Sequence, residues 1–213
     1  MLPNMLTPSG HTSQRGEPTW EIASLFPDQG DWSEAAFLAL PSPHRFELCD
    51  GKLELLPMAT WLHQEIAWFL CECLRAFLKS QPVGRCVVAP LFVRLAVKKI
   101  RQPDVVFAFH EHIAADLRKI QHGADLVMEV VSPGEDSRER DWVEKRELYA
   151  AAGIAEYWFV DPEREEIVVF TLNAQGAYDI AGEFKRGSQA TSRLLNGFTV
   201  DVSATFTAGE VKS

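Results

Sequence analysis

Residues 125–131 read Asp-Leu-Val-Met-Glu-Val-Val, and this stretch decides the fold class more than any other part of the chain. Five of its seven residues are apolar, without the alternation of a half-exposed strand, which predicts a β-strand covered on both faces in the middle of a sheet. Glu129 is the exception. A buried carboxylate is costly to ionise unless a cation or several hydrogen-bond donors meet it. Glu129 is therefore either one half of a structural ion pair with an arginine or a functional carboxylate, and the functional interpretation is favoured.

The sequence on both sides of this stretch predicts an α/β fold with a mixed sheet flanked by helices. Asp50-Gly51 is the turn pair most typical of a tight β-hairpin, between strands expected at 46–48 and 52–56. Apolar residues recur at three- and four-residue steps over 61–79, which predicts an amphipathic helix. The other elements expected are helices over 33–40 and 137–152, strands over 85–89, 91–96, 105–109, 157–160 and 166–171, weaker strands to about 202, and a basic loop over 98–101.

The chain has 213 residues, 46% of them hydrophobic, which fits one domain with a substantial core. Residues 1–31 are rich in Pro, Ser, Gly and Thr and are expected to be a flexible leader. Residues 32–202 are expected to form the folded domain, and residues 203–213 a C-terminal tail. The four cysteines show neither zinc spacing nor a disulfide framework, which favours reduced thiols. No apolar run approaches the roughly 18 residues of a membrane span, and no secretory signal is recognisable, so we expect a cytoplasmic protein without a membrane partner.

The net charge bears on possible partners. It is -9, from 21 Lys and Arg against 30 Asp and Glu. This balance argues against broad, charge-driven binding of nucleic acid. It remains compatible with a local basic surface and with a site that gathers carboxylates around a cation. A serine hydrolase is not indicated, because the Gly-x-Ser-x-Gly motif does not occur.

Asp104 and Lys145 are further candidates for a site. Asp104 follows a proline, which favours an extended start to its strand, and is the only charge before five apolar residues. Alone, such an aspartate is as often a turn or capping residue. Two carboxylates on neighbouring strand ends, however, form the usual oxygen-rich site for Mg²⁺ or Mn²⁺, which the main-chain carbonyl of Val130 would extend. Lys145 lies in the apolar stripe of helix 137–152, and with Glu129 on the preceding strand we expect it to reach an internal anion.

Two more polar residues are weaker candidates. Glu47 lies in the first strand of the expected hairpin, as part of its polar face, as a second metal ligand, or as a carboxylate that orients water. His63, near the start of helix 61–79, is more often a capping or core histidine than a residue that faces a site.

Five stretches together resemble one protein family. They are residues 45–54, His63, residues 102–106 (Gln-Pro-Asp-Val-Val), residues 125–133, and residues 141–161 (DWVEKRELYAAAGIAEYWFVD). In this order they resemble the Uma-type restriction endonuclease family, which is grouped with the PD-(D/E)XK nuclease superfamily. The resemblance runs from about residue 32 to residue 172, and it is far more specific than a single Asp or Glu.

The resemblance implies a restriction-endonuclease-like core with Asp104 and Glu129 as metal ligands. The chain departs from the simplest superfamily pattern, because the lysine normally found two residues after the glutamate is Val131 here. A lysine on the following helix substitutes in this family, and in this chain that residue is Lys145. The implied reaction is Mg²⁺- or Mn²⁺-dependent hydrolysis of DNA phosphodiesters. Substrate would be bound by Lys98, Lys99, Arg101, Arg138 or Arg140, which are equally well interpreted as solvated surface charges. His63 could also bind substrate, although a capping or core role is the favoured interpretation for it.

Two classes of function remain open. A catalytically silent binding or assembly module is favoured by the net charge and by Val131. An active endonuclease is favoured because the set Glu47, Asp104, Glu129 and Lys145 is complete, whereas a decayed site should have lost at least one costly buried charge. A structural metalloprotein or a hydrolase of another phosphate is a third possibility that no residue specifies. A homodimer is plausible for an endonuclease, because two sites are the simplest way to cut both strands.

Overall fold

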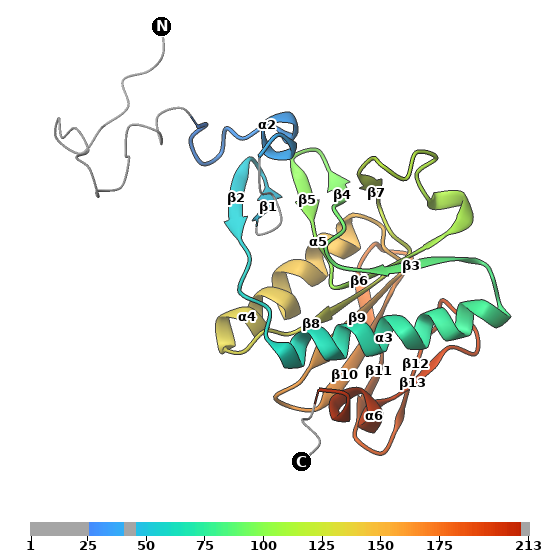
Figure 1. Ribbon diagram of the computed structural model, residues 1–213. Helices are drawn as coiled ribbons and strands as arrows, with labels where there is room; N and C mark the ends of the chain where they lie inside the picture. Colours follow the sequence, from blue (N-terminus) through green and yellow to red (C-terminus); the bar gives the residue numbers. More distant parts are fainter. Residues whose placement is uncertain (1–25, 41–45, 210–213) are drawn as a thin grey trace, which may run out of the picture.

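The computed structural model describes residues 26–40 and 46–209, and the following statements concern these residues (Figure 1). A larger sheet has the strand order β11-β10-β9-β8-β6-β3, in which only β8 and β9 are parallel neighbours. Its strands are β3 (Gly84–Val88), β6 (Val105–Phe109), β8 (Leu126–Val130), β9 (Glu156–Asp161), β10 (Glu166–Leu172) and β11 (Tyr178–Lys185). The expected central position of residues 125–131 is confirmed, because β8 lies between β9 and β6.

A smaller sheet lies above the larger one in Figure 1 and has the order β2-β1-β5-β4-β7. Its strands are β1 (Phe46–Cys49), β2 (Lys52–Leu55), β4 (Val93–Ala96), β5 (Lys99–Arg101) and β7 (Gln121–His122). The β1–β2 hairpin turns at Asp50 and Gly51, which both have positive φ, as a two-residue turn of this type requires. A side chain at Gly51 would also clash with the carbonyl oxygen of Gly30, 2.1 Å from the position of a Cβ atom.

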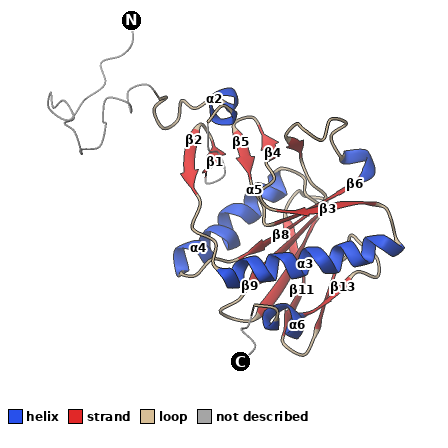
Figure 2. Cartoon of the chain, viewed as in Figure 1, coloured by secondary structure: helices blue, strands red, loops and turns tan. Residues whose placement is uncertain are grey.

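Helices cover both faces of the larger sheet (Figures 1 and 2). On one face lie α3 (Trp61–Ser80) and the short α6 (Val202–Thr207), beside a two-stranded ribbon of β12 (Gln189–Thr191) and β13 (Thr199–Asp201). On the other face, α4 (Glu135–Glu139), the π-helical turn η3 (Arg140–Lys145) and α5 (Arg146–Ala151) form one continuous helical segment. The remaining helices are α2 (Glu34–Leu38), capped by the Ser33 side chain, and the 3₁₀ turn η2 (His110–His112).

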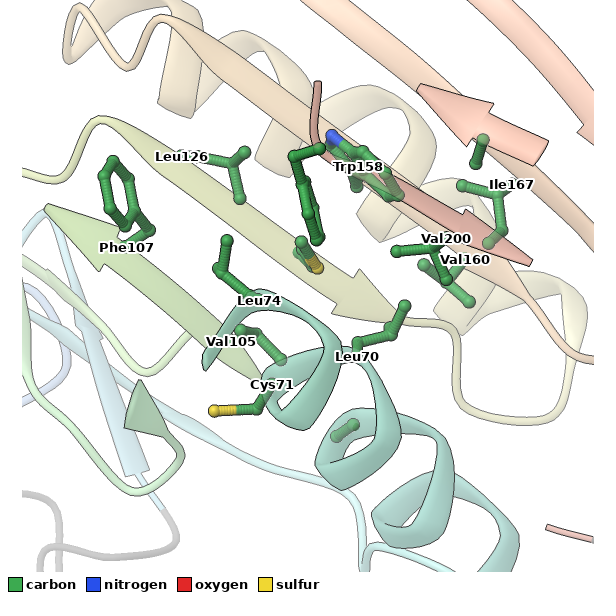
Figure 3. Packing of buried hydrophobic residues seen from close by; sticks show 14 of the residues in the cluster. Leu70, Cys71, Leu74, Val105, Phe107, Leu126, Trp158, Val160, Ile167 and Val200 are labelled. Atoms are coloured by element: carbon green, nitrogen blue, oxygen red, sulfur yellow. The ribbon is translucent and has the colours of Figure 1, made fainter. Parts of the chain in front are cut away.

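Two apolar clusters hold these layers together. Leu126, Met128 and Val130 of β8 belong to the cluster with α3, in which Leu74 lies beside Val105 (Figure 3). The alternate residues of β8 point to the other face, where Val127 packs in a cluster with Tyr149 of α5. Because side chains alternate along a strand, Glu129 points to the same face as Val127, toward η3 and α5.

Several sequence-based expectations differ from the structure. The expected basic loop over 98–101 contains a strand, β5, which pairs with both β1 and β4. The expected tail from residue 203 begins with α6, whose Phe206 is buried in the cluster under α3. The helix expected over 137–152 begins at Glu135 and contains the π-turn.

The expected leader, residues 1–31, lies mostly outside the described residues. Its described end is bound to the hairpin: the Gly30 amide donates to the Gly51 carbonyl at 2.8 Å, and the Leu53 amide donates to the Gln29 side chain at 2.7 Å. The four cysteines are all free thiols, as expected. Within the described ranges, no helix combines the length and the apolar character needed to span a membrane.

Candidate functional site

A cleft of about 420 Å³ opens where the chain passes between the two sheets. Its walls are the segment that links β2 to α3, the first turn of α3, the links from β3 to β4 and from β5 to β6, the C-terminal end of β8, and η3. Asp104, Glu129, Val130, His63, Asp141 and Lys145 all line it. The fold therefore brings together residues that are up to 82 positions apart, from His63 to Lys145.

Asp104 lies at the entrance of β6 with both carboxylate oxygens engaged. Its Oδ2 accepts a hydrogen bond of 2.8 Å from the Val130 amide, and its Oδ1 lies 3.0 Å from His63 Nε2. Burial alone would raise the pKa of Asp104, but the hydrogen bond and charge of His63, the charge of Lys145 and the Val130 amide together lower it. Asp104 is therefore held as a carboxylate at neutral pH.

Asp125 makes the same contacts at the opposite end of the same pair of strands. It immediately precedes β8, accepts a hydrogen bond of 2.8 Å from the amide of Phe109 in β6, and lies 2.8 Å from His112 Nδ1. β6 and β8 are antiparallel, so the start of each strand lies beside the end of the other. Asp104 precedes β6 and binds the end of β8, whereas Asp125 precedes β8 and binds the end of β6. The contacts of Asp104 thus have a structural counterpart outside the cleft, and Asp125 is a natural control for Asp104.

Glu129 is 2% exposed near the C-terminal end of β8 and is bound by two donors from the helical segment. The Tyr149 hydroxyl donates to Oε1, and Lys145 Nζ lies 2.9 Å from Oε2. Burial raises the pKa of Glu129 and the nearby carboxylates Asp104 and Asp141 add to the increase, whereas the charge of Lys145 acts in the opposite direction and favours the carboxylate. Glu129 does not form the structural ion pair with an arginine that was the alternative expectation, because its charged partner is Lys145.

Lys145 lies at the end of η3 and is only 5% exposed. Its Nζ lies between Glu129 and Asp141, at 2.9 and 3.0 Å. Burial would lower the pKa of Lys145, but the charges of Asp141 and Glu129 outweigh burial and raise it. The expectation that Lys145 reaches an internal anion thus agrees with these contacts, and the side chain stays charged.

Asp141 is a site residue that the sequence reasoning did not single out. It is buried, it pairs with Lys145, and its main-chain carbonyl accepts a hydrogen bond of 3.0 Å from the Tyr157 hydroxyl. The only signal in the sequence is its i, i+4 spacing from Lys145, which places both side chains on one side of a helix. That signal is weak, because the helix carries many charged residues.

His63 enters the cleft from the first turn of α3 rather than serving only as a core or capping residue. Its Nδ1 atom is buried and has no hydrogen-bond partner within the described residues. Burial lowers the pKa of the imidazole, and the hydrogen bond and charge of Asp104 more than compensate, so the net shift is upward. His63 thus both fixes the Asp104 carboxylate and leaves one ring nitrogen without a partner.

Glu47 does not line the cleft. Its Oε2 lies 2.8 Å from the buried Arg101 guanidinium, and its Oε1 accepts a hydrogen bond of 2.7 Å from the Gln102 amide. Arg101 also pairs with Glu54. These contacts bind Glu47 and Arg101 to the segment that leads into Asp104, and Glu47 is close enough for its charge to raise the pKa of both Glu129 and Lys145. A role of Glu47 as a metal ligand or of Arg101 in substrate binding stays a prediction.

The other cations expected to bind substrate are spread over the molecule. Lys99 pairs with Asp50 at 3.4 Å, and Arg138 pairs with Asp161 at 3.3 Å while stacking on Trp142. Lys98 lies in the turn between β4 and β5. Of these arginines and lysines, only Arg140 lines the cleft, where its Nε atom lies 3.4 Å from Asp141.

The donor set can be tested for a divalent cation. No three His, Cys, Asp or Glu side chains of the described ranges are arranged as a metal-binding group. Asp104 and Glu129 nevertheless present four carboxylate oxygens, each with one hydrogen bond or ion pair, so that each retains a second lone pair. The Val130 carbonyl points to the same strand edge as its amide, toward Asp104. Oxygen donors of this type are the ligands that Mg²⁺ and Mn²⁺ prefer. The cluster also contains more carboxylates than lysines.

Comparisons with known proteins agree with this architecture. A family model described as "Uma2: Putative restriction endonuclease" matches residues 34–203. No curated protein matches the chain. A solved structure described as a putative nuclease belonging to DUF820, from Anabaena variabilis ATCC 29413, matches with a TM-score of 0.69 and 16% sequence identity, over 84% of this chain and 99% of that chain. This likeness shows the fold, an α/β core with mixed sheets flanked by helices.

Proposed function

Because the chain belongs to the Uma2 family, which is described as putative restriction endonucleases, we propose that it is a divalent-metal-dependent nuclease that hydrolyses phosphodiester bonds in DNA. The observation that carries the proposal is the position of Lys145. Its Nζ atom lies 2.9 Å from Glu129 Oε2 in the cleft, although Lys145 comes from a helix and not from the strand that carries Glu129. A charged lysine beside carboxylates that can hold a metal ion suits the hydrolysis of a phosphodiester, in which negative charge builds on the phosphate oxygens.

Asp104 and Glu129, with the Val130 carbonyl, would hold the cation. A bound Mg²⁺ or Mn²⁺ supplies Lewis acidity at the scissile phosphate and lowers the pKa of a coordinated water. Lys145 stabilises the negative charge that builds on the phosphate oxygens, a contribution worth about 10²- to 10³-fold in rate for a single well-placed donor. Asp141 and Tyr149 hold Lys145 and Glu129 in place, and His63 holds Asp104.

The second candidate function is a catalytically silent module with the nuclease fold. It is favoured by the pairing of both basic side chains that line the cleft, Arg140 and Lys145, with carboxylates of the cleft. A homodimer that would cut both strands belongs to the first proposal and would be visible as the mass of the protein in solution.

The test is nicking of supercoiled plasmid by the full chain with Mg²⁺ or Mn²⁺ and with EDTA. We expect metal-dependent nicking that Asp104→Asn abolishes. Asp125→Asn is the matched control, because Asp125 makes the same two contacts outside the cleft and its loss should cost similar stability but leave nicking intact. Nicking by Asp104→Asn at the wild-type rate would contradict the metal site. Absence of nicking by a folded wild-type protein with every metal would favour the silent module.

A further inference from the structure

An apolar rim lies beside the cleft. It consists of Leu55, Met58, Trp61 and Leu62, which are 65%, 75%, 77% and 39% exposed. These residues follow one another from the end of β2 to the first turn of α3. Single exposed apolar residues are common on protein surfaces, but a group that includes a tryptophan exposed on most of its surface indicates a contact with another molecule.

The rim continues directly into the cleft. Met58 lines the cleft, as do its neighbours Leu56 and Pro57. Trp61 is the first residue of α3, and His63, two positions later, binds Asp104. Trp61 lies three residues before Gln64, which lines the cleft, so the two side chains share one face of α3 at its first turn.

The Lys and Arg side chains of the cleft offer little electrostatic attraction for a nucleic-acid backbone. Duplex-binding proteins obtain most of their affinity from lysines and arginines that neutralise phosphates. In this cleft the Lys and Arg side chains, Lys145 and Arg140, are both paired with carboxylates of the cleft. The chain as a whole carries a net charge of -9. Affinity for a polyanion therefore has to come from uncharged contacts in addition to a cation.

The size of the cleft also matches a small substrate group. Its volume of about 420 Å³ lies in the range of pockets that hold one small molecule. This space suits one nucleotide. An exposed tryptophan offers the uncharged contact, because every base has a π-face that stacks on an aromatic ring regardless of sequence.

We propose that the cleft takes an unpaired nucleotide of DNA, from a single strand or an opened duplex, and that its base or a neighbouring base stacks on Trp61 at the rim. This proposal rests on the nuclease function proposed above and specifies the substrate class. Trp61 binds the substrate without touching the reacting atoms, and the carboxylates and Lys145 act on the phosphate.

The test measures binding as well as cleavage. A fluorescein-labelled 12-nucleotide single strand and the same strand in a duplex are titrated with the full chain, with Ca²⁺ in place of Mg²⁺, and anisotropy is recorded. We expect the single strand to bind more tightly than the duplex. Trp61→Ala should weaken single-strand binding by about 5- to 150-fold, the range reported for loss of one stacked base, while Trp61→Phe should retain most of the affinity.

The chain offers a matched control in Trp68. It lies on the same helix, is 45% exposed, and is about 10.5 Å further along the helix axis, away from the cleft. Trp68→Ala should leave binding unchanged. A strand with one abasic nucleotide, scanned along the sequence, adds a coupling test: the abasic position that weakens wild-type binding should have no further effect in Trp61→Ala.

The outcomes separate the two proposals. If the wild-type protein nicks plasmid but Trp61→Ala binds the single strand as tightly as the wild type, or if the abasic effect persists in Trp61→Ala, the stacking proposal is overturned and the nuclease stands. If the wild type is a dimer and Trp61→Ala a monomer with unchanged DNA binding, the rim is an interface between copies and the proposal is overturned. A folded wild type that neither binds nor cleaves DNA overturns both.

Discussion

At the scale of single residues, the cleft is a balance of buried charges. Glu129, Asp141 and Asp104 face Lys145 and His63, so each charge depends on the others for its solvation. Removing one partner of such a group leaves an uncompensated buried charge, which is more costly than the original pair was favourable. Stability measurements on single and double variants can therefore reveal these contacts independently of any activity.

Lys145→Met is the most informative substitution of this kind. We expect it to destabilise the protein by about 3–5 kcal/mol, because Glu129 and Asp141 lose their shared cation. Adding Glu129→Gln should recover part of that loss, because the double variant buries one charge fewer. Urea unfolding of the two single variants and the double variant measures the coupling. Strict additivity of the two effects would contradict a direct interaction between Glu129 and Lys145.

Glu47→Gln tests whether Glu47 holds the segment before Asp104 in place or binds a metal ion. The structure binds Glu47 to Arg101 and to the Gln102 amide, so we expect a loss of about 1–3 kcal/mol in the free energy of unfolding. Arg101 retains Glu54, which limits the loss. Mn²⁺ affinity, measured by calorimetry, should stay within about threefold of the wild type, a change below about 0.7 kcal/mol. A loss of metal affinity as large as that of Asp104→Asn would make Glu47 a ligand after all.

Sequence reasoning found Asp104, Glu129 and Lys145 because each is a charge inside an apolar pattern, where a charge needs an explanation. It did not find Asp141, which lies among other charged residues of a helix and has no such contrast. The pairing of Glu47 with Arg101 joins residues 54 positions apart. No local pattern encodes that register, so both residues were expected to meet ligands.

At the scale of elements, the π-turn η3 is the feature that shapes the site. A π-turn holds one residue more than an α-helical turn, and such turns often occur at functional sites. Here it sets the angular relation between Asp141, near its start, and Lys145, at its end. The sequence predicted the helix from its periodicity, but a single extra residue leaves no visible mark in that pattern. The strand β5, only three residues long, was missed for a related reason, since its two basic residues resemble a loop.

Deletion of Val143 tests the role of η3. Removing one residue should convert the π-turn to regular α-helix and change the spacing of Asp141 and Lys145 from i, i+4 to i, i+3, which alters the geometry of their ion pair. Tyr149 and α5 should remain against Glu129. We expect a folded protein, judged by circular dichroism, whose nicking falls by at least about tenfold, because the altered pair with Asp141 displaces Lys145 from its position beside Glu129. Deletion of Gln175 in the exposed turn after β10 is the control, and it should not affect nicking. Unchanged nicking after Val143 deletion would show that the π-turn is incidental.

At the scale of the whole molecule, the described structure moves the limits expected for the domain. Residues 26–31 bind the β1–β2 hairpin, and α6 packs under α3, so we propose a folded unit from about residue 26 to residue 207. The fold class followed from the sequence, because the buried strands and amphipathic helices have strong periodic patterns. The division into two sheets did not, since it depends on which strands pair across long distances.

The position of the cleft between the two sheets has a further consequence for how the protein moves. Asp104 lies in the short link, residues 102–104, that leads from β5 of the smaller sheet into β6 of the larger one, while Glu129 lies within the larger sheet. A cation held by both carboxylates would therefore fix this link against the larger sheet, and local opening of the link and of the smaller sheet beside it would become costlier. Amide hydrogen exchange in β1 and in residues 102–104 should slow by about 100-fold when Mn²⁺ is present at 100 times its dissociation constant, compared with EDTA. Asp104→Asn should cancel this protection. The smaller sheet, which supplies no carboxylate of its own to the cleft, would then report whether the site is occupied.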